Sequence, residues 1–345
     1  YDIPNARKVH KNAIPRLGGI CFLPCTLIAF IFGIAILNLL TGRRQITIGT
    51  WSVMFLISLS LIYIIGIVDD IVGVRPRTKF AVQIIAASLL PLSGLYINNM
   101  YGMFGIHELP FWVGAPLTVF VLVFIDNAMN LIDGIDGLAA GLAFIALGGF
   151  LYGFYCIELY IYCILIAGLM GILLAYMYYN IFGNPEKGLK IFMGDSGSLT
   201  IGFMLSFFTI KFAMSRPDLI PCGKYGITLF CSDMPYEKVC LAFAYSLMIV
   251  PTFDVFRVII VRMKHHTPIF NPDKRHIHHK FLAIGLNQHQ TLVSILSLQL
   301  AYIIINLAMI PYVCISLIEL IDIILFIAIN MVMTRIINKK QAAKN

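Results

Sequence analysis

Two adjacent carboxylates, Asp69 and Asp70, end a long apolar run and are the residues of this chain best suited to chemistry. A charged side chain inside a bilayer costs about 2.5 to 3.5 kcal/mol on insertion scales, so a pair needs a compensating role. At a helix end, one carboxylate could hold a divalent cation while the other takes a proton. Basic side chains follow that could contact phosphate oxygens: Arg75, Arg77 and Lys79. A solvated loop with a helix cap is the alternative.

A second polar segment lies between two apolar runs. Its amide and carboxyl side chains recur every three residues, at Asn127, Asn130, Asp133 and Asp136. Residues with this spacing are neighbours on a helix surface, and Gly134 and Gly137 allow the backbone to turn or to approach a ligand. Amide and carboxylate oxygens suit Mg²⁺ or the edge of a base, although simple capping of two helices is the alternative.

The third segment is Gly194-Asp195-Ser196-Gly197, directly before another apolar run. Asp195 and Ser196 are typical helix N-cap residues, which is the structural alternative. The four residues also match a serine protease signature, but they adjoin a membrane span and no β-rich, disulfide-bearing domain surrounds them. A carboxylate beside a helix N-terminus could place a metal and a diphosphate together.

A fourth group combines carboxylate, guanidinium and imidazole side chains. Asp254 and Arg257 are three residues apart on one span, where mutual neutralisation is favoured over direct catalysis. The loop 262–290 then carries a tract rich in basic side chains, Lys274, Arg275, His276, His278, His279 and Lys280. The tract has no partnering Cys and its spacing is too tight for the usual zinc sites. We expect its imidazoles to bind phosphate or to protonate a leaving group.

Composition places these segments in a membrane protein. Of the 345 residues, 59% are hydrophobic and 12% are charged, and the mean hydropathy is +0.88. Because about 20 apolar residues cross the hydrocarbon core as a helix, the sequence predicts one all-α domain over residues 1–345, a polytopic membrane helical bundle. About ten spans are expected, at 20–40, 51–68, 80–97, 112–130, 138–156, 159–180, 198–213, 238–261, 291–310 and 313–334.

Lys and Arg are divided unevenly between the two sides. With the N-terminus inside, 18 of the 25 Lys and Arg residues lie in inner loops and six in outer loops, as the positive-inside rule requires. The net charge of +8 therefore reflects topology, is compatible with anionic substrates, and does not indicate a nucleic acid partner. Residues 1–19 and 262–290 are expected to be cytoplasmic loops, and 214–236 an outer loop.

Three further features have open interpretations. The chain begins at Tyr1 with a basic loop, so we expect an additional span upstream; Pro15 with Gly18-Gly19 suggests a fixed turn at a close backbone contact, or else a plain positive-inside anchor. Cys222 and Cys231 share the outer loop and could form a disulfide. Glu319 and Asp322 lie in the last span with no basic residue nearby in sequence, which suggests an outward-facing helix end or a subunit contact.

Taken together on one side of the membrane, these segments resemble the polyprenyl-phosphate N-acetylhexosamine-1-phosphate transferase superfamily, whose bacterial members include the WecA and MraY types. The resemblance covers nearly the whole chain. It implies a helical bundle of usually eleven spans, often a homodimer, in the bacterial inner membrane, with its active site on cytoplasmic loops. In the family reaction a lipid phosphate attacks the β-phosphate of a UDP-sugar and releases UMP.

The resemblance also implies roles for individual residues. Asp69, Asp70, Asp133 and His279 would be catalytic, the Asp69–Asp70 pair deprotonating or positioning the lipid phosphate. Asp195 and Asp70 would hold Mg²⁺, with Mn²⁺ as an alternative ion. Lys79 would bind phosphate, Asp136 and a stacked Phe192 the uracil. The other implied substrate contacts are Asn127, Arg275, His276 and His278.

The Arg-His-Ile-His-His form of residues 275–279 resembles the WecA type more than the MraY type. It implies UDP-N-acetylglucosamine or a related UDP-N-acetylhexosamine and undecaprenyl phosphate as substrates. A phospho-MurNAc-pentapeptide transferase is the nearest alternative. An anion transporter is a more distant one, because transporters place polar groups near the membrane midplane and often show repeated halves, whereas these polar clusters lie at one face and the chain shows no internal repeat. Lys274 departs from the family pattern, where Arg is common, and keeps the charge without the bidentate geometry.

Overall fold

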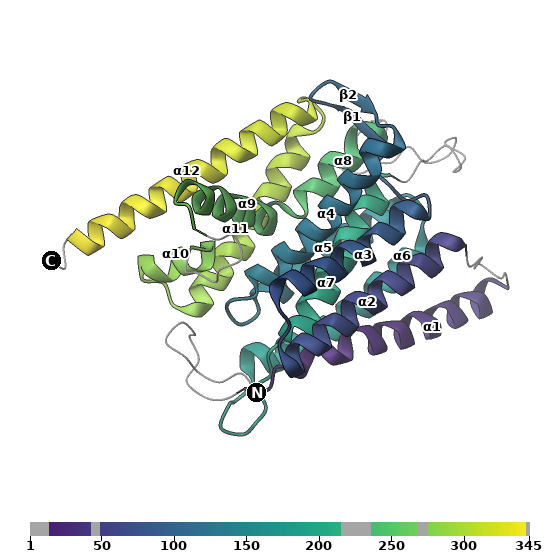
Figure 1. Cartoon of the computed structure of the whole chain (residues 1–345), viewed down its shortest axis with the longest axis horizontal. Coiled ribbons are helices and arrows are strands. Elements are labelled where there is room, and N and C mark those ends of the chain that lie inside the picture. Colours follow the sequence, from purple (N-terminus) through teal and green to yellow (C-terminus); the bar gives the residue numbers. More distant parts are fainter. Residues whose placement is uncertain (1–13, 43–48, 215–235, 268–274, 343–345) are drawn as a thin grey trace.

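The computed structural model describes residues 14–42, 49–214, 236–267 and 275–342, and these form a helical bundle with one small β-hairpin (Figure 1). Cys222 and Cys231 lie outside the described residues. The elements in chain order are η1 (Leu17–Cys21), α1 (Phe22–Thr41), α2 (Thr50–Val72), α3 (Pro76–Leu92), β1 (Asn99–Met103), β2 (Ile106–Glu108), α4 (Phe111–Ile132), α5 (Leu138–Cys156), α6 (Tyr160–Phe182), α7 (Gly194–Ala213), α8 (Tyr236–Ser246), α9 (Ile249–Lys264), α10 (Ile277–Ile284), α11 (Gln288–Met309) and α12 (Ile315–Ala342).

Within these described ranges, eight helices are long and apolar enough to cross a membrane, and nine if α8 and α9 form one span. The expected polytopic bundle is therefore confirmed, but with fewer spans than the ten predicted. The predicted span 80–97 corresponds to α3, which has only 17 residues and ends at Leu92. The predicted span 238–261 is broken, because α8 and α9 meet at an angle of 71°.

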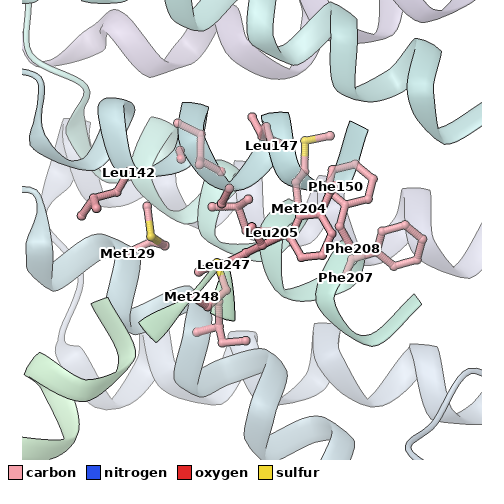
Figure 2. Packing of buried hydrophobic residues seen from close by; sticks show 14 of the residues in the cluster. Met129, Leu142, Leu147, Phe150, Met204, Leu205, Phe207, Phe208, Leu247 and Met248 are labelled. Carbon is pink, nitrogen blue, oxygen red and sulfur yellow. The ribbon is translucent and has the colours of Figure 1, made fainter. Parts of the chain in front are cut away.

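Helix α7 lies at the centre of the bundle and packs most extensively on α4 and α2. Nearly all of its side chains are buried, so no face of the helix is exposed along most of its length. Figure 2 shows Met204, Phe207 and Phe208 of α7 near Phe150 of α5 and Leu247 at the α8–α9 bend. Helix α7 is thus enclosed by other helices, and this packing supports the polar residues at its N-terminus.

A polar side chain from α11 stabilises the break between α8 and α9. Gln299 accepts a hydrogen bond from the Val250 amide at 3.0 Å and donates to the Ser246 carbonyl at 2.8 Å. Backbone groups freed by a kink inside a membrane helix must find such partners. The sequence predicted one span over 238–261 without this break, because the partner that stabilises the break is distant in sequence.

The same region corrects the interpretation of Asp322. Its side chain is fully buried and accepts hydrogen bonds from Asn306 at 2.8 Å and Tyr245 at 3.1 Å. Asp322 therefore faces the interior of the bundle and not an outward-facing helix end. Glu319, one turn earlier, is partly exposed.

The β1–β2 hairpin was not predicted, and it lies at the end of the bundle where α8 and α12 contact it (Figure 1). Tyr101 donates to the Ala213 carbonyl at 3.0 Å, and Ser316 accepts from the Phe104 amide at 2.7 Å. These bonds join the hairpin to the C-terminal end of α7 and the start of α12. The polar segments of interest lie at the opposite end of α7.

Candidate active site

Lys79 joins two carboxylates that come from different helices. Its ammonium lies 2.8 Å from Asp69 Oδ2 on α2 and 2.6 Å from Asp195 Oδ2 on α7. The amide of Val74 also donates to Asp69 Oδ1 at 2.5 Å. Burial disfavours the charge of the ammonium, but the Asp195 and Asp69 carboxylates outweigh this and raise the pKa of Lys79 above its ordinary value. Lys79 is thus a permanent cation between two carboxylates.

Asp70 holds the N-terminus of α7. Its two oxygens accept hydrogen bonds from the backbone amides of Asp195 and Ser196, each at 2.8 Å. A carboxylate here satisfies free amides and complements the helix dipole. The sequence suggested Asp195 and Ser196 as the N-cap, whereas the carboxylate that bonds these first-turn amides comes from α2. Asp70 therefore fixes the position of Asp195.

The first residue of α7, Gly194, can be replaced by no other amino acid without strain. Gly194 has φ +70°, and a Cβ there would lie 2.2 Å from the Arg16 carbonyl and 2.5 Å from Asp70 Oδ2. Any other side chain would be strained by its backbone conformation and would collide with the capping carboxylate.

Residues 15–19, at the start of the described part of the chain, hydrogen-bond to residues 192–193, just before α7. The amides of Gly18 and Gly19 donate to the carbonyls of Phe192 and Met193 at 3.0 and 2.9 Å, and the Phe192 amide donates to Pro15 at 2.8 Å. A Cβ on Gly19 would lie 2.1 Å from the Gly197 amide nitrogen. This confirms the prediction that Pro15 and Gly18-Gly19 mark a close backbone contact.

From α4, Asn130 is the residue that contacts Asp195. Its amide donates to Asp195 Oδ1 at 2.7 Å and to Ser198 at 2.8 Å. Asn127 instead donates to Gln83 at 3.0 Å, and Gln83 donates to the buried Asp126 at 2.9 Å. Asn130 was noted for its spacing but was not among the predicted substrate contacts, and it lies one turn beyond Asn127, whose bonds run to a different set of partners.

Asp136 forms an ion pair with Lys190, whose ammonium lies 2.6 Å from Asp136 Oδ2. Lys190 had no role in the sequence prediction. Phe192 lies two residues after Lys190 and is partly buried. The structure thus brings Asp136 to Lys190, in the segment that carries Phe192 and precedes Asp195.

The segment of residues 275–279, called the His segment below, reaches this site through His278. Its ring packs against Gly134, where a Cβ would lie 2.3 Å from His278 Nε2. His278 is buried, and burial together with the neighbouring His279 and His276 lowers its pKa to about 3. His278 is therefore a neutral imidazole at physiological pH. The contact between Gly134 and His278 brings the His segment beside the C-terminal end of α4.

The His segment is also tied to α9. Asp254 accepts from His276 Nδ1 at 2.9 Å and pairs with Arg257 at 2.7 Å, so the predicted mutual neutralisation is confirmed. Lys280 turns away from the segment, donating to Asn330 at 3.1 Å and Thr334 at 3.2 Å on α12. Arg275 and His279 flank His276 and His278 in the chain, and Lys274 of the predicted tract lies outside the described residues.

The carboxylates at Lys79 have the composition of a magnesium site. Among the described residues no three His, Cys, Asp or Glu side chains form a metal cluster. However, Mg²⁺ is commonly held by one or two carboxylates plus substrate phosphates, and Asp69 and Asp195 already converge on one cation, the Lys79 ammonium. The donor set therefore fits Mg²⁺.

Comparison with known proteins agrees with this geometry. Residues 51–213 match the model of glycosyl transferase family 4. The chain is 32% identical over 302 residues to a probable undecaprenyl-phosphate N-acetylglucosaminyl 1-phosphate transferase of Bacillus subtilis, covering 85% of this chain and 73% of that protein. It is 33% identical over 307 residues to a decaprenyl-phosphate N-acetylglucosaminephosphotransferase of Mycobacterium tuberculosis, covering 86% and 72%.

A third relative, the undecaprenyl-phosphate alpha-N-acetylglucosaminyl 1-phosphate transferase of Escherichia coli K12, is 28% identical over 301 residues, covering 85% of this chain and 72% of its own. All three alignments extend well beyond the residues that the family model matches. The resemblance inferred from the motifs is confirmed, and the chain belongs to glycosyl transferase family 4, the family of polyprenyl-phosphate sugar-1-phosphate transferases.

Proposed function

We propose that this protein transfers N-acetylglucosamine 1-phosphate, or a related N-acetylhexosamine 1-phosphate, from its UDP-sugar to undecaprenyl phosphate. The products are UMP and a lipid diphosphate sugar that begins lipid-linked glycan synthesis. The observation that carries the proposal is the Lys79 ammonium, held by Asp69 and Asp195 at the ends of two membrane helices. The names of the relatives support the sugar and the lipid.

The reaction is a phosphoryl transfer, in which positioning and charge neutralisation provide most of the catalysis. Lys79 supplies a fixed positive charge beside the diphosphate. Of Asp69 and Asp70, only Asp69 pairs with the Lys79 ammonium. We therefore assign Asp69 to the lipid phosphate, either as the group that accepts its proton or as the group that positions it. Asp70 acts by holding the first turn of α7.

The uridine half of the substrate is assigned to the other side of the α7 turn. The Asp136–Lys190 pair offers both an acceptor and a donor to a uracil edge, and Phe192 offers an aromatic face for stacking. Asn127, Asp133 and the His segment with Arg275, His276, His278 and His279 would complete the substrate contacts. His278 would serve as a neutral donor or acceptor, since its pKa of about 3 excludes a charged form.

Mg²⁺, or Mn²⁺ in its place, would be held by Asp195 together with Asp69 or Asp70. The ion would neutralise negative charge on the diphosphate of the substrate during the transfer. Asn130 orients Asp195 for this task through its 2.7 Å hydrogen bond. Because Asp69 and Asp195 both pair with Lys79, an ion held by these carboxylates would compete with its ammonium, which would then be available to the substrate phosphates.

The basic residues support a cytoplasmic active site. Their inner excess of 18 to six supports an orientation in which the ends of α2 and α4 and the His segment lie on the cytoplasmic side of a bacterial inner membrane. A homodimer remains part of the proposal and is tested by the mass of the purified protein in detergent.

The deciding experiment is UMP release by purified protein with undecaprenyl phosphate, Mg²⁺ and a panel of UDP-sugars. We expect release with UDP-N-acetylglucosamine and its dependence on both the lipid and the metal. UDP-MurNAc-pentapeptide is the matched competitor, and release with it alone would move the protein to the peptidoglycan-precursor branch. If no UDP-sugar gives UMP, the proposed function is wrong.

A further inference from the structure

The His segment is anchored by one buried carboxylate on α9. We infer that Asp254 is a positioning residue that fixes the orientation and the tautomer of His276 toward the diphosphate of the substrate. This inference rests on the proposed function, because it concerns the same transfer site.

Asp254 is fully buried, and three donors meet its two oxygens. Oδ2 faces His276 Nδ1 at 2.9 Å. Oδ1 accepts from the Ile277 amide at 3.0 Å and from Arg257 Nη2 at 2.7 Å. Two of the three donors belong to consecutive residues of the His segment, so the carboxylate holds both the ring and the backbone at the start of α10.

Arg257 extends this attachment by one residue. Its Nη2 also donates to the Arg275 carbonyl at 2.5 Å. The Asp254–Arg257 pair therefore hydrogen-bonds to the backbone on both sides of His276, at the Arg275 carbonyl and at the Ile277 amide. An ion pair that only neutralised two charges in the membrane would not need these bonds, which direct the pair at the His segment.

The bond to Nδ1 determines which atom of His276 can meet substrate. A ring nitrogen that faces a carboxylate carries hydrogen, so the network assigns the proton to Nδ1 and leaves Nε2 as an acceptor, which takes up a proton before it can donate to a phosphate oxygen. If that contact protonates Nε2, the adjacent Asp254 carboxylate stabilises the imidazolium, as in other carboxylate–histidine pairs. His278 differs, because its buried Nδ1 has no hydrogen-bond partner among the described residues.

The decisive variant is Asp254→Asn, which keeps the size of the side chain. With Oδ1 still accepting from Ile277 and Arg257, the new amide group points an N–H at His276 Nδ1. That nitrogen must then become an acceptor, so the proton moves to Nε2. Nitrogen-15 NMR of histidine-labelled, substrate-free protein in nanodiscs reports this change, and a His276→Gln sample identifies the signal.

We expect the His276 signals to change from the Nδ1–H to the Nε2–H form in Asp254→Asn. We also expect a loss of about 10- to 100-fold in kcat, the range seen when groups that orient a functional histidine are replaced, with little change in KM for UDP-N-acetylglucosamine. In a His276→Gln background, Asp254→Asn should add less than threefold, because both changes remove one interaction.

Two variants control for folding. Asp322→Asn replaces another fully buried carboxylate that touches Asn306 and Tyr245 but not the His segment, and it should leave the His276 signals and kcat unchanged. Asp254→Glu keeps the acceptor and should keep the Nδ1–H form, which tests the inference even if the Asn variant fails to fold.

Unchanged His276 signals in folded Asp254→Asn, or fully additive losses in the double variant, would overturn the inference. The NMR measurement needs no turnover. A wild-type protein that releases no UMP would therefore reject the proposed function while still reporting whether Asp254 sets the His276 tautomer.

Discussion

Two buried polar networks occupy opposite ends of this bundle, and they differ in charge and in access. At the candidate active site, Lys79 and Asp195 keep 16% and 29% of their side-chain exposure and carry opposite charges. Near the hairpin, Asp322 is 0% exposed and is bonded to the neutral side chains of Asn306 and Tyr245. Of these two networks, the first is therefore partly exposed, whereas Asp322 in the second is enclosed. The second joins the broken α8–α9 pair to α11 and α12.

The comparison predicts opposite outcomes for two similar substitutions. Asp195→Asn should lower UMP release by about 10³-fold, because it removes a charge that the transferring phosphates and their cation require. Asp322→Asn should retain activity, since Asn can keep the acceptor toward Tyr245. The test is the initial rate of UMP release by variants that are equally monodisperse in detergent. Equal losses of rate in both variants would show that the two networks do not differ in their role in catalysis.

A second prediction concerns the cation already present in the first network. Lys79→Met should reduce turnover by about 10²-fold through loss of a phosphate contact. The same change should strengthen Mn²⁺ binding about tenfold in substrate-free protein, because the ammonium no longer competes for Asp69 and Asp195. Electron paramagnetic resonance of free Mn²⁺ measures the affinity. Weaker Mn²⁺ binding in Lys79→Met would contradict the shared use of these carboxylates.

The hairpin-side network should respond in stability rather than in catalysis. Gln299→Leu leaves the Val250 amide and the Ser246 carbonyl without their partner, a loss of about 1 to 3 kcal/mol in unfolding free energy. Thermal unfolding in detergent is the measurement, and kcat of the folded fraction should stay within about twofold. Gln299→Glu offers the matched control, because burial favours its neutral acid, which keeps an acceptor for the Val250 amide and an O–H donor for the Ser246 carbonyl.

The smallest expected effect is at Lys280, which links α10 to α12. Burial, with Arg257 adding to it and Asp254 opposing it, lowers the pKa of Lys280 to about 8 from an ordinary 10.5. The unfolded chain then binds more protons than the folded one between these values, so stability rises with pH across this window. Relative to Lys280→Met, the unfolding free energy of the wild type should rise by less than about 1 kcal/mol from pH 8 to 10, because the partial exposure of Lys280 weakens the effect.

Features set by local pattern were predictable from the sequence. Apolar run lengths predicted the bundle, and the spacing of Asn127, Asn130, Asp133 and Asp136 identified one polar helix end. Gly18-Gly19 marked a close backbone contact because only glycine tolerates one. The motif order, through its family resemblance, placed Asp69, Asp195 and the His segment at one site.

Features that depend on partners distant in sequence were not predictable. Gln299 supports a break some 50 residues away, so the α8–α9 bend had no local signal. Asp70 could not be identified as the cap of α7, and Lys190 could not be matched to Asp136, because each pairing is created only by helix packing. Asp322 looked unpartnered because Asn306 and Tyr245 come from other helices.

The attachment of Asp70 to the first turn of α7 has a consequence for how the protein is made. The bonded residues are 125 and 126 positions apart in the chain. At roughly 5 to 20 residues per second, translation needs on the order of 6 to 25 seconds to cover that interval. Helix α2 thus enters the bilayer before the amides that Asp70 bonds have been made, whereas Asp69 finds Val74 and Lys79 within ten residues. Insertion of α7 is the event that supplies the partners of Asp70, and truncated chains ending before Ser196 should be prime substrates for membrane quality-control proteases.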